Sequence, residues 1–240
     1  MARIVSATLR QLGENFWIAE GPVVDFYSFP YPTRMAVARL AVGALWIWSP
    51  IPLTDSLRAE LAALGRPAHL VSPNKLHHLF MGEWASEFPG ARLWGLPSVI
   101  RKRADLKFTG ALSDEPPEDW RGEIDHALFR GSVIMDEIVF FHRASRTALF
   151  ADLIENFSID FLRNTPGWQG WKTTYARLGG ITEPVGRAPL EWRLSFVRRA
   201  SARAALGRVR GWAPLNVVMA HGTITRDGAP AFIRESFAWL

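Results

Sequence analysis

The chain has 240 residues, of which 48% are hydrophobic and 21% are charged, and its formal net charge is +5. This composition is typical of a globular protein and excludes an intrinsically disordered chain. Because the sequence contains no cysteine, it excludes disulfides, thiolate metal sites and cysteine nucleophiles, so any metal ion would need His, Asp or Glu ligands.

A chain of this length can fold as one α/β sandwich or barrel. No linker or internal repeat divides it, so a single domain is predicted for residues 1–240. Residues 1–14 lack a long apolar core and carry Glu14, which argues against a secretory signal. The most apolar stretch, residues 35–53, is interrupted by Arg39 and Pro50, whereas a membrane helix needs about 20 mostly apolar residues. We therefore expect a cytoplasmic protein that does not enter a membrane.

Arginine supplies most of the positive charge and clusters at residues 101–103 and 198–210. Such clusters can bind nucleic acid. No recognised nucleic-acid motif accompanies them, so we interpret them as solvated helix surfaces and do not expect a nucleic-acid partner.

The first half of the sequence alternates short strands with helices. Thr54 to Ser56 form an N-cap cluster, Leu57, Leu61 and Leu64 recur at helical spacing, and Gly65 suits the end of that helix. A second helix follows the turn at residues 72–74 and runs to about Phe88. Strands are predicted at residues 16–19, 23–26, 35–42, 44–48, 68–71 and 91–94, the first two as a pair.

The second half begins with a hairpin and is then mostly helical. Residues 136–142 and 147–151 form the predicted hairpin, and residues 112–120 and 179–189 are loops. Helices are predicted at 153–164, 169–178, 190–209 and 232–240, and a last strand at 216–220. The order of elements indicates an α/β fold with mixed sheets whose faces are covered by helices.

Three predicted strands end close to side chains that bind metals. The strand at 68–71 precedes His77 and His78, the strand at 147–151 precedes Asp152, and the strand at 216–220 precedes His221. Ligands bind outside the carboxyl ends of strands in open α/β sheets. If the three ends share one rim, these imidazoles and this carboxylate meet there and offer nitrogen and oxygen ligands for zinc, iron or manganese.

Each of these residues also has a structural interpretation. Asp152 could be the N-cap of a helix that begins at Leu153, His221 could belong to a plain strand-to-turn junction, and a lone histidine is usually a satisfied polar residue. The shared placement at strand ends makes the functional interpretation of the whole set about as strong as the structural one.

Three segments resemble the motifs of the metallo-β-lactamase superfamily. S-P-N-K-L-H-H stands in place of T-H-x-H-x-D-H, F-A-D-L in place of a strand that ends in G-D, and A-H-G-T in place of a strand that ends in H-G. The similarity extends from about Asn15 to the end and is greatest to an uncharacterised branch of the superfamily. It implies a four-layer αβ/βα sandwich with mixed sheets.

The departures from these motifs imply a degenerate active site. Pro73 and Lys75 occupy the places of the first two histidines. Proline has no side-chain ligand, and a lysine ammonium repels a cation. The G-H-T-P-G stretch of the family has no equivalent before Ile138. The resemblance therefore implies that the first metal position is lost.

The resemblance leaves four residues for the second metal position. His77 stands in place of the catalytic aspartate, His78 on a retained histidine, Asp152 on the bridging aspartate and His221 on the last histidine. They imply a mononuclear zinc, iron or manganese site in which His77 and Asp152 are catalytic. A protein without any metal is an equally open outcome.

We assign Asn74, His142 and Arg146 to substrate binding. His142 and Arg146 flank the predicted hairpin turn, where Arg146 could clamp an anion at the edge of a pocket. A turn in which Ser145 bonds its own backbone is the simpler interpretation. The arginine-rich surface favours an anionic substrate.

Two functions follow from the resemblance. The first is a metal-dependent hydrolase that activates water against an ester, amide, thioester or phosphoester. The alternative is a non-catalytic protein of the same fold that binds an anionic small molecule or a protein partner. Some relatives of the fold cleave nucleic acids, but the lost first position argues against that activity here. The sequence does not predict an oligomeric state.

Overall fold

The structure is a computed structural model that describes residues 8–240 and divides them into two compact units. Unit 1 comprises residues 8–22, Thr33–Asp125 and His142–Ser145, and unit 2 comprises Val23–Pro32, His126–Phe141 and Arg146–Leu240. The single domain predicted for residues 1–240 stays a prediction. Residues 1–7, which begin the segment interpreted above as lacking a signal, lie outside the described part.

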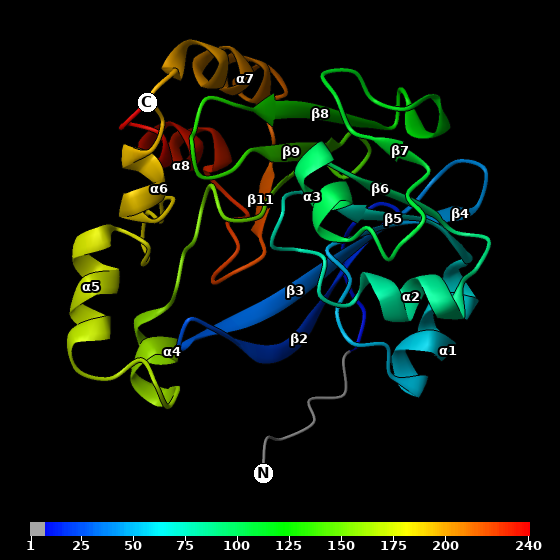
Figure 1. Cartoon of the computed structure of the whole chain (residues 1–240), viewed down its shortest axis with the longest axis horizontal. Coiled ribbons are helices and arrows are strands. Elements are labelled where there is room, and N and C mark those ends of the chain that lie inside the picture. The colour runs from blue at the N-terminus through cyan, green and yellow to red at the C-terminus, as the bar shows by residue number, and fades with distance from the viewer. Residues whose placement is uncertain (1–7) are drawn as a thin grey trace. The chain divides into compact units, whose positions relative to one another are not determined.

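Most of unit 1 is built on a sheet that has seven strands among the described residues. These strands lie side by side in chain order (Figure 1). The pairs β1–β2 and β3–β4 are antiparallel, whereas β4, β5, β6 and β7 are parallel neighbours, so the sheet is mixed, as predicted. The strands are β1 (Arg10–Gly13), β2 (Phe16–Phe26), β3 (Phe29–Arg39), β4 (Ala44–Trp48), β5 (Arg66–Ser72), β6 (Arg92–Gly95) and β7 (Gly110–Ala111).

The helices of unit 1 are short and pack on the parallel strands. α1 (Asp55–Leu64) begins at Thr54, whose hydroxyl accepts a hydrogen bond from the amide of Leu57 at 3.2 Å, as the N-cap cluster predicted. Its buried Leu57 and Leu61 join the core formed by Ile47 and Leu70. The remaining helices are α2 (Met81–Glu87), α3 (Pro97–Lys102) and the 3₁₀ turn η1 (Glu118–Trp120).

One prediction for this sheet is wrong. The two strands expected at residues 16–19 and 23–26 are a single strand, β2. Gly21, which lies between the two predicted strands, is inside β2 and does not form a turn. A Cβ atom at this position would lie only 2.3 Å from Oγ1 of Thr33, so the glycine permits close packing inside a continuous strand.

The sheet of unit 2 has four strands among the described residues, in the order β11, β10, β9, β8. These are β8 (Ile124–Phe129), β9 (Glu137–His142), β10 (Thr147–Phe150) and β11 (Asn216–Met219). The predicted hairpin is confirmed as the neighbouring strands β9 and β10. β10 and β11 are parallel, with Phe150 opposite Met219.

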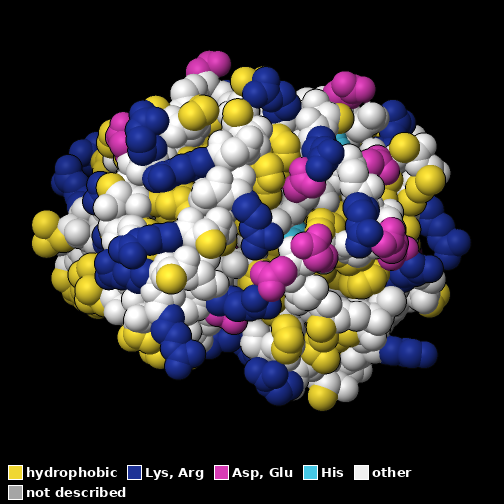
Figure 2. All heavy atoms as spheres, turned by 90° about the horizontal axis from the view of Figure 1, so that it is seen from above, with side chains coloured by type: hydrophobic (Ala, Val, Ile, Leu, Met, Phe, Trp, Pro, Cys, Tyr) yellow, Lys and Arg dark blue, Asp and Glu magenta, His cyan; other side chains and the backbone are white. Residues whose placement is uncertain are grey.

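Five helices accompany this sheet in the described chain: α4 (Ile159–Asn164), α5 (Trp171–Gly179), α6 (Leu190–Leu194), α7 (Arg199–Gly211) and α8 (Ala229–Ser236). α6, α7 and α8 lie beside the sheet in Figure 1 and share one hydrophobic core with it. In α7, Ala202, Ala205, Leu206 and Val209 are buried at helical spacing. The arginines of α7 that lie between them are largely exposed, and Figure 2 shows basic side chains over the face that carries this helix.

Residues 153–158 were predicted to be helical and are not. α4 begins only at Ile159, with Ser158 as its N-cap. The amides of Glu155, Asn156 and Phe157 instead donate to carbonyl oxygens of Arg187, His221 and Ile181 at 2.9–3.1 Å. Tertiary hydrogen bonds therefore replace the helical ones, and Asp152 is not a helix N-cap.

The helix predicted at 190–209 is two helices, α6 and α7. The break follows from a bridge between Phe196 and Ser132 and from a hydrogen bond of 3.1 Å between the amide of Arg198 and the carbonyl of Gly131. The closing helix, predicted at 232–240, is α8 and ends at Ser236. Among the described residues, no helix is long and apolar enough to cross a bilayer.

Candidate metal centre

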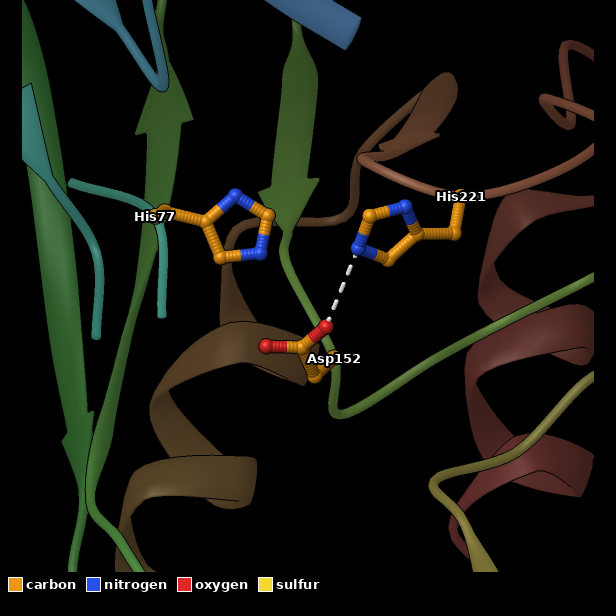
Figure 3. Close-up of side chains that lie close together, drawn as sticks. All are labelled: His77, Asp152 and His221. Atoms are coloured by element: carbon orange, nitrogen blue, oxygen red, sulfur yellow. Dashed lines mark ion pairs between the residues drawn. The ribbon is translucent and has the colours of Figure 1, made fainter. Parts of the chain in front are cut away.

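Asp152 and His221 follow two parallel neighbouring strands at equivalent positions. Phe150 and Met219 are opposite each other in the register of β10 and β11, and each candidate ligand comes two residues later. Parallel strands end at the same edge of a sheet, so both side chains lie at one edge of unit 2. Nε2 of His221 lies 3.2 Å from Oδ1 of Asp152 (Figure 3), and each side chain is only 7% exposed.

A buried glutamate fixes the loop that carries Asp152. The carboxylate of Glu137, at the start of β9, accepts hydrogen bonds from the amides of Ala151 and Asp152 at 2.9 Å and from the amide of Leu153 at 3.4 Å. Glu137 is completely buried. Its two oxygens thus hold three consecutive amides, so the direction of the Asp152 side chain is set by the start of the neighbouring strand.

The ring of His221 is oriented by the backbone of β3. Its Nδ1 lies 2.6 Å from the carbonyl oxygen of Pro32, and a carbonyl oxygen can only accept, so Nδ1 carries a hydrogen. The ring of Tyr31 packs edge-on against the imidazole, with centroids 4.9 Å apart. With Nδ1 protonated, the Nε2 atom of a neutral ring presents its lone pair to Asp152.

This arrangement places two acceptors 3.2 Å apart. The contact is favourable when a second proton or a metal cation binds both atoms. Adjacent ligand atoms of a tetrahedral zinc ion lie roughly 3.4 Å apart, because Zn–N and Zn–O distances are about 2.0–2.2 Å. Metal-binding histidines also commonly donate their other ring N–H to a backbone carbonyl, as His221 does. The pair therefore fits a zinc, iron or manganese ion.

The turn after His221 needs a glycine. Gly222 has a φ of +101°, and a Cβ atom there would lie 2.1 Å from the carbonyl oxygen of Asn156. That carbonyl accepts a hydrogen bond from the amide of Thr223 at 2.7 Å, while the amide of Asn156 donates to the carbonyl of His221 at 3.1 Å. The His-Gly dipeptide is thus tied to the segment that follows Asp152.

His77 lies in unit 1, on the loop after β5. The hydroxyl of Ser72 lies within hydrogen-bonding distance of the carbonyl oxygens of Asn74 and His77, at 2.8 and 2.9 Å. The side chain of Asn74 accepts a hydrogen bond from the amide of Leu76 at 2.8 Å. These local bonds give the loop a defined path away from β5.

The ring of His77 also has a defined partner. Its Nδ1 lies 2.8 Å from the hydroxyl of Ser49, which directly follows β4, the parallel neighbour of β5. Ser49 has a positive φ of +50° and its amide donates to the carbonyl of Val71 at 2.9 Å. The ends of two parallel strands thus supply both the histidine and the group that orients it.

Asp152 and His221, both in unit 2, could each offer one ligand atom to a metal ion (Figure 3). The predicted ligands His77 and His78 belong to unit 1. His78 is 8% exposed, and burial, together with the charges of Lys102 and Arg103, lowers its pKa to about 4. The roles of His77 and His78 as ligands stay predictions.

The three residues assigned to substrate binding have other contacts in the structure. Asn74 is buried in the loop it organises. His142 is buried, and its Nδ1 lies 2.8 Å from the hydroxyl of Ser145, so this serine contacts the imidazole. Arg146 donates to the carbonyl of Ala213 at 2.6 Å and precedes β10, at the opposite end of that strand from Asp152. Their roles in substrate binding stay predictions.

Three residues that shape the site were not identified from the sequence: Ser49, Glu137 and Pro32. For Glu137 a signal existed, because this acidic residue directly precedes the apolar stretch I-V-F-F in the predicted strand at 136–142, and a buried carboxylate is costly without partners. Ser49 and Pro32 act through a strand-end hydroxyl and a backbone carbonyl, which have no sequence signature.

Comparison with solved structures shows the fold of the chain. A DIM-1 metallo-β-lactamase exposed to ceftazidime matches with a TM-score of 0.62 and 15% identity over 98% of this chain and 97% of that one. A metallo-β-lactamase from Erythrobacter litoralis, with β-mercaptoethanol in its active site, matches with a TM-score of 0.62 and 12% identity over 99% of each chain. One from Pontibacter korlensis has a TM-score of 0.61 and 9% identity, over 97% of this chain and 99% of that one. The predicted metallo-β-lactamase-like α/β fold with mixed sheets is thereby confirmed.

Sequence comparison adds one family. The family model described as a domain of unknown function, DUF4336, matches residues 23–162. No curated protein matches the chain. The matched segment contains His77 and Asp152, whereas His221 lies beyond it.

Proposed function

The chain belongs to the DUF4336 family of domains of unknown function, and from that premise we propose that it is a metal-dependent hydrolase with one metal ion bound by His77, Asp152 and His221. The observation that carries the proposal is the contact of 3.2 Å between Nε2 of His221 and Oδ1 of Asp152, two buried ligand atoms close enough to bind one cation together. The metallo-β-lactamase-like fold supports it as well.

A bound divalent ion would lower the pKa of a coordinated water to about 7 and so supply a nucleophile at neutral pH. Groups of the protein itself position the three proposed ligands. Glu137 holds the Asp152 loop, the carbonyl of Pro32 fixes the ring of His221, and Ser49 orients His77. We assign both metal binding and catalysis to His77 and Asp152, because ligands of the ion would adjoin the water that it activates.

The proposed substrate is an ester, amide, thioester or phosphoester of an anionic small molecule. The net charge of +5 favours a negatively charged substrate. A single metal position is proposed because Pro73 and Lys75 stand where the superfamily has its first two histidines. The metal is zinc, iron or manganese, since imidazole and carboxylate ligands suit all three.

The same two residues favour the alternative, a non-catalytic protein that binds an anionic small molecule or a protein partner. An ammonium group at position 75 disfavours a second cation, and His77 replaces the aspartate that the superfamily uses in catalysis. In this alternative the protein is metal-free, and its melting temperature rises with the anionic ligand instead.

Metal loading followed by elemental analysis tests the proposal. The protein is stripped with a chelator, loaded with zinc, iron(II) or manganese, and passed through a desalting column. We expect about one equivalent of metal and a higher melting temperature. Asp152→Ala and His221→Ala should each lose the metal, while Asp227→Asn, a change of an exposed aspartate in the same unit, should keep it. Metal at background level in the loaded wild-type protein would refute the proposal.

A further inference from the structure

Two arginines of unit 2 lie together outside the candidate metal centre. Arg187 belongs to the segment that pairs with Glu155, and Arg193 lies in α6. A Cβ atom on Gly180 would lie 3.6 Å from Nη1 of Arg187 and 3.9 Å from Nη2 of Arg193. Both guanidinium groups therefore pack against the same glycine, at the carboxyl end of α5.

The two guanidinium groups lack partners for buried donors. Within the described part of the chain, the Nε atoms of Arg187 and Arg193 are both buried and have no hydrogen-bond partner. Nη2 of Arg193 donates to the carbonyl oxygen of Gly179, at the negative end of the α5 dipole. One donor of Arg193 therefore has a partner. Burying a donor without a partner is unfavourable, so this pair favours an acceptor supplied by a ligand.

The charges around Arg187 and Arg193 also favour the binding of an anion. Burial first, and then the positive charge of Arg187, lower the pKa of Arg193. The carboxylate of Glu191 acts in the opposite direction and more weakly, and it accepts a hydrogen bond from the hydroxyl of Tyr175 at 2.7 Å. Neither arginine forms an ion pair with a carboxylate of the described residues. Two like charges thus remain side by side.

We propose that Arg187 and Arg193 form a binding site for an oxyanion, a carboxylate or phosphate group of a small molecule, held between the two guanidinium groups beside Gly180. Guanidinium groups bind such groups through paired N–H donors, and an anion between them would satisfy the buried Nε atoms and cancel the repulsion. A carboxylate and a phosphate share this chemistry. The site needs no metal ion, so it stands whether or not the proposed hydrolase function does.

Thermal unfolding of the chelator-stripped protein tests this site. Sodium phosphate and sodium acetate are compared with sodium chloride at matched ionic strength, so that general screening is the same in each. We expect at least one of the two oxyanions to raise the melting temperature above the value in chloride. A rise with phosphate alone assigns the site to phosphate groups, and a rise with acetate assigns it to carboxylates.

Variants locate the effect. Arg187→Gln should weaken the affinity for that anion at least about tenfold by calorimetric titration. In chloride it should unfold at no lower temperature than the wild type, because it removes a repelling charge. Arg177→Gln, a change of an exposed arginine in α5, should leave the affinity unchanged. Arg193→Gln also removes a bond to α5, so Arg187→Gln is the decisive variant. No rise with either oxyanion, or an undiminished rise in Arg187→Gln, would overturn the proposal.

Discussion

The backbone amide of Asp152 donates a hydrogen bond of 2.9 Å to the carboxylate of Glu137. A buried acid at the start of one strand thus sets the position of a candidate metal ligand at the end of the next. Groups that position a ligand without contacting the metal commonly change metal affinity by 10–100-fold when they are removed. The proposed role of Asp152 as a ligand therefore depends on a residue that would not itself contact the metal.

Glu137→Gln should weaken both the fold and the metal site. The amide group of glutamine replaces one acceptor oxygen by a donor, which leaves at least one buried amide of residues 151–153 without a partner. We expect the free energy of unfolding in urea to fall by about 1–3 kcal/mol. Zinc affinity in a competition titration should fall about 10–100-fold. Glu235→Gln, an exposed change in α8, is the control, and an unchanged zinc affinity in Glu137→Gln would contradict the positioning role.

His77 and His78 should differ in their effect on metal binding. The proposed metal site includes His77 but not His78, whose side chain is buried near the charges of Lys102 and Arg103. We expect His77→Ala to reduce the bound metal from one equivalent to near background, and His78→Ala to retain it. Elemental analysis of the two loaded variants checks this. Loss of metal in His78→Ala with a normal melting temperature would instead support the four-ligand site predicted from the sequence.

Ser49→Ala should lower metal affinity without removing a ligand. The hydroxyl of Ser49 is 2.8 Å from Nδ1 of His77, so its loss frees the ring to rotate and to exchange tautomers. We expect zinc affinity to fall about tenfold or more, with metal still bound at saturating concentration. Ser56→Ala, a change at an exposed position of α1, serves as the matched control. Equal affinities for Ser49→Ala and the wild type would show that the hydroxyl does not orient the ligand.

His142 should contribute to acid unfolding. Burial lowers its pKa in the folded state to about 4, whereas an unfolded histidine titrates near 6.5. Between these values the unfolded state binds more protons than the folded state. The contribution of the neutral His142 to the free energy of unfolding is therefore fully present above about pH 6.5 and is lost as the pH falls toward 4. The free energy of unfolding in urea should depend less on pH over this range in His142→Gln than in the wild type. An equal pH dependence in the two proteins would be inconsistent with a buried neutral imidazole.

Much of the fold could be predicted because local chemistry and tertiary structure agree. Thr54 caps α1 as its side chain suggested, and short runs of mostly apolar residues locate β4 and β5. The failures occur where tertiary contacts override local preference. Residues 153–158 were predicted to be helical, but the amides of residues 155–157 donate to carbonyls of Arg187, His221 and Ile181, which lie much later in the chain.

The candidate site was predictable to the extent that it depends on strand ends. Asp152 and His221 were found because each follows an apolar strand, and the register of β10 and β11 brings them together. The carbonyl of Pro32, which fixes the tautomer of His221, could not be found, because every residue carries a carbonyl. Arg187 and Arg193 were not found either, because their proximity follows from the packing of both side chains against Gly180.

The parallel pairing of β10 with β11 also has a kinetic consequence. The two strands are separated by residues 151–215, so the chain must close a long loop, at an entropic cost, before Asp152 and His221 meet. A metal ion that binds both residues can therefore do so only in molecules that have already folded. Added zinc should consequently slow unfolding of the mature protein and leave the rate of refolding nearly unchanged.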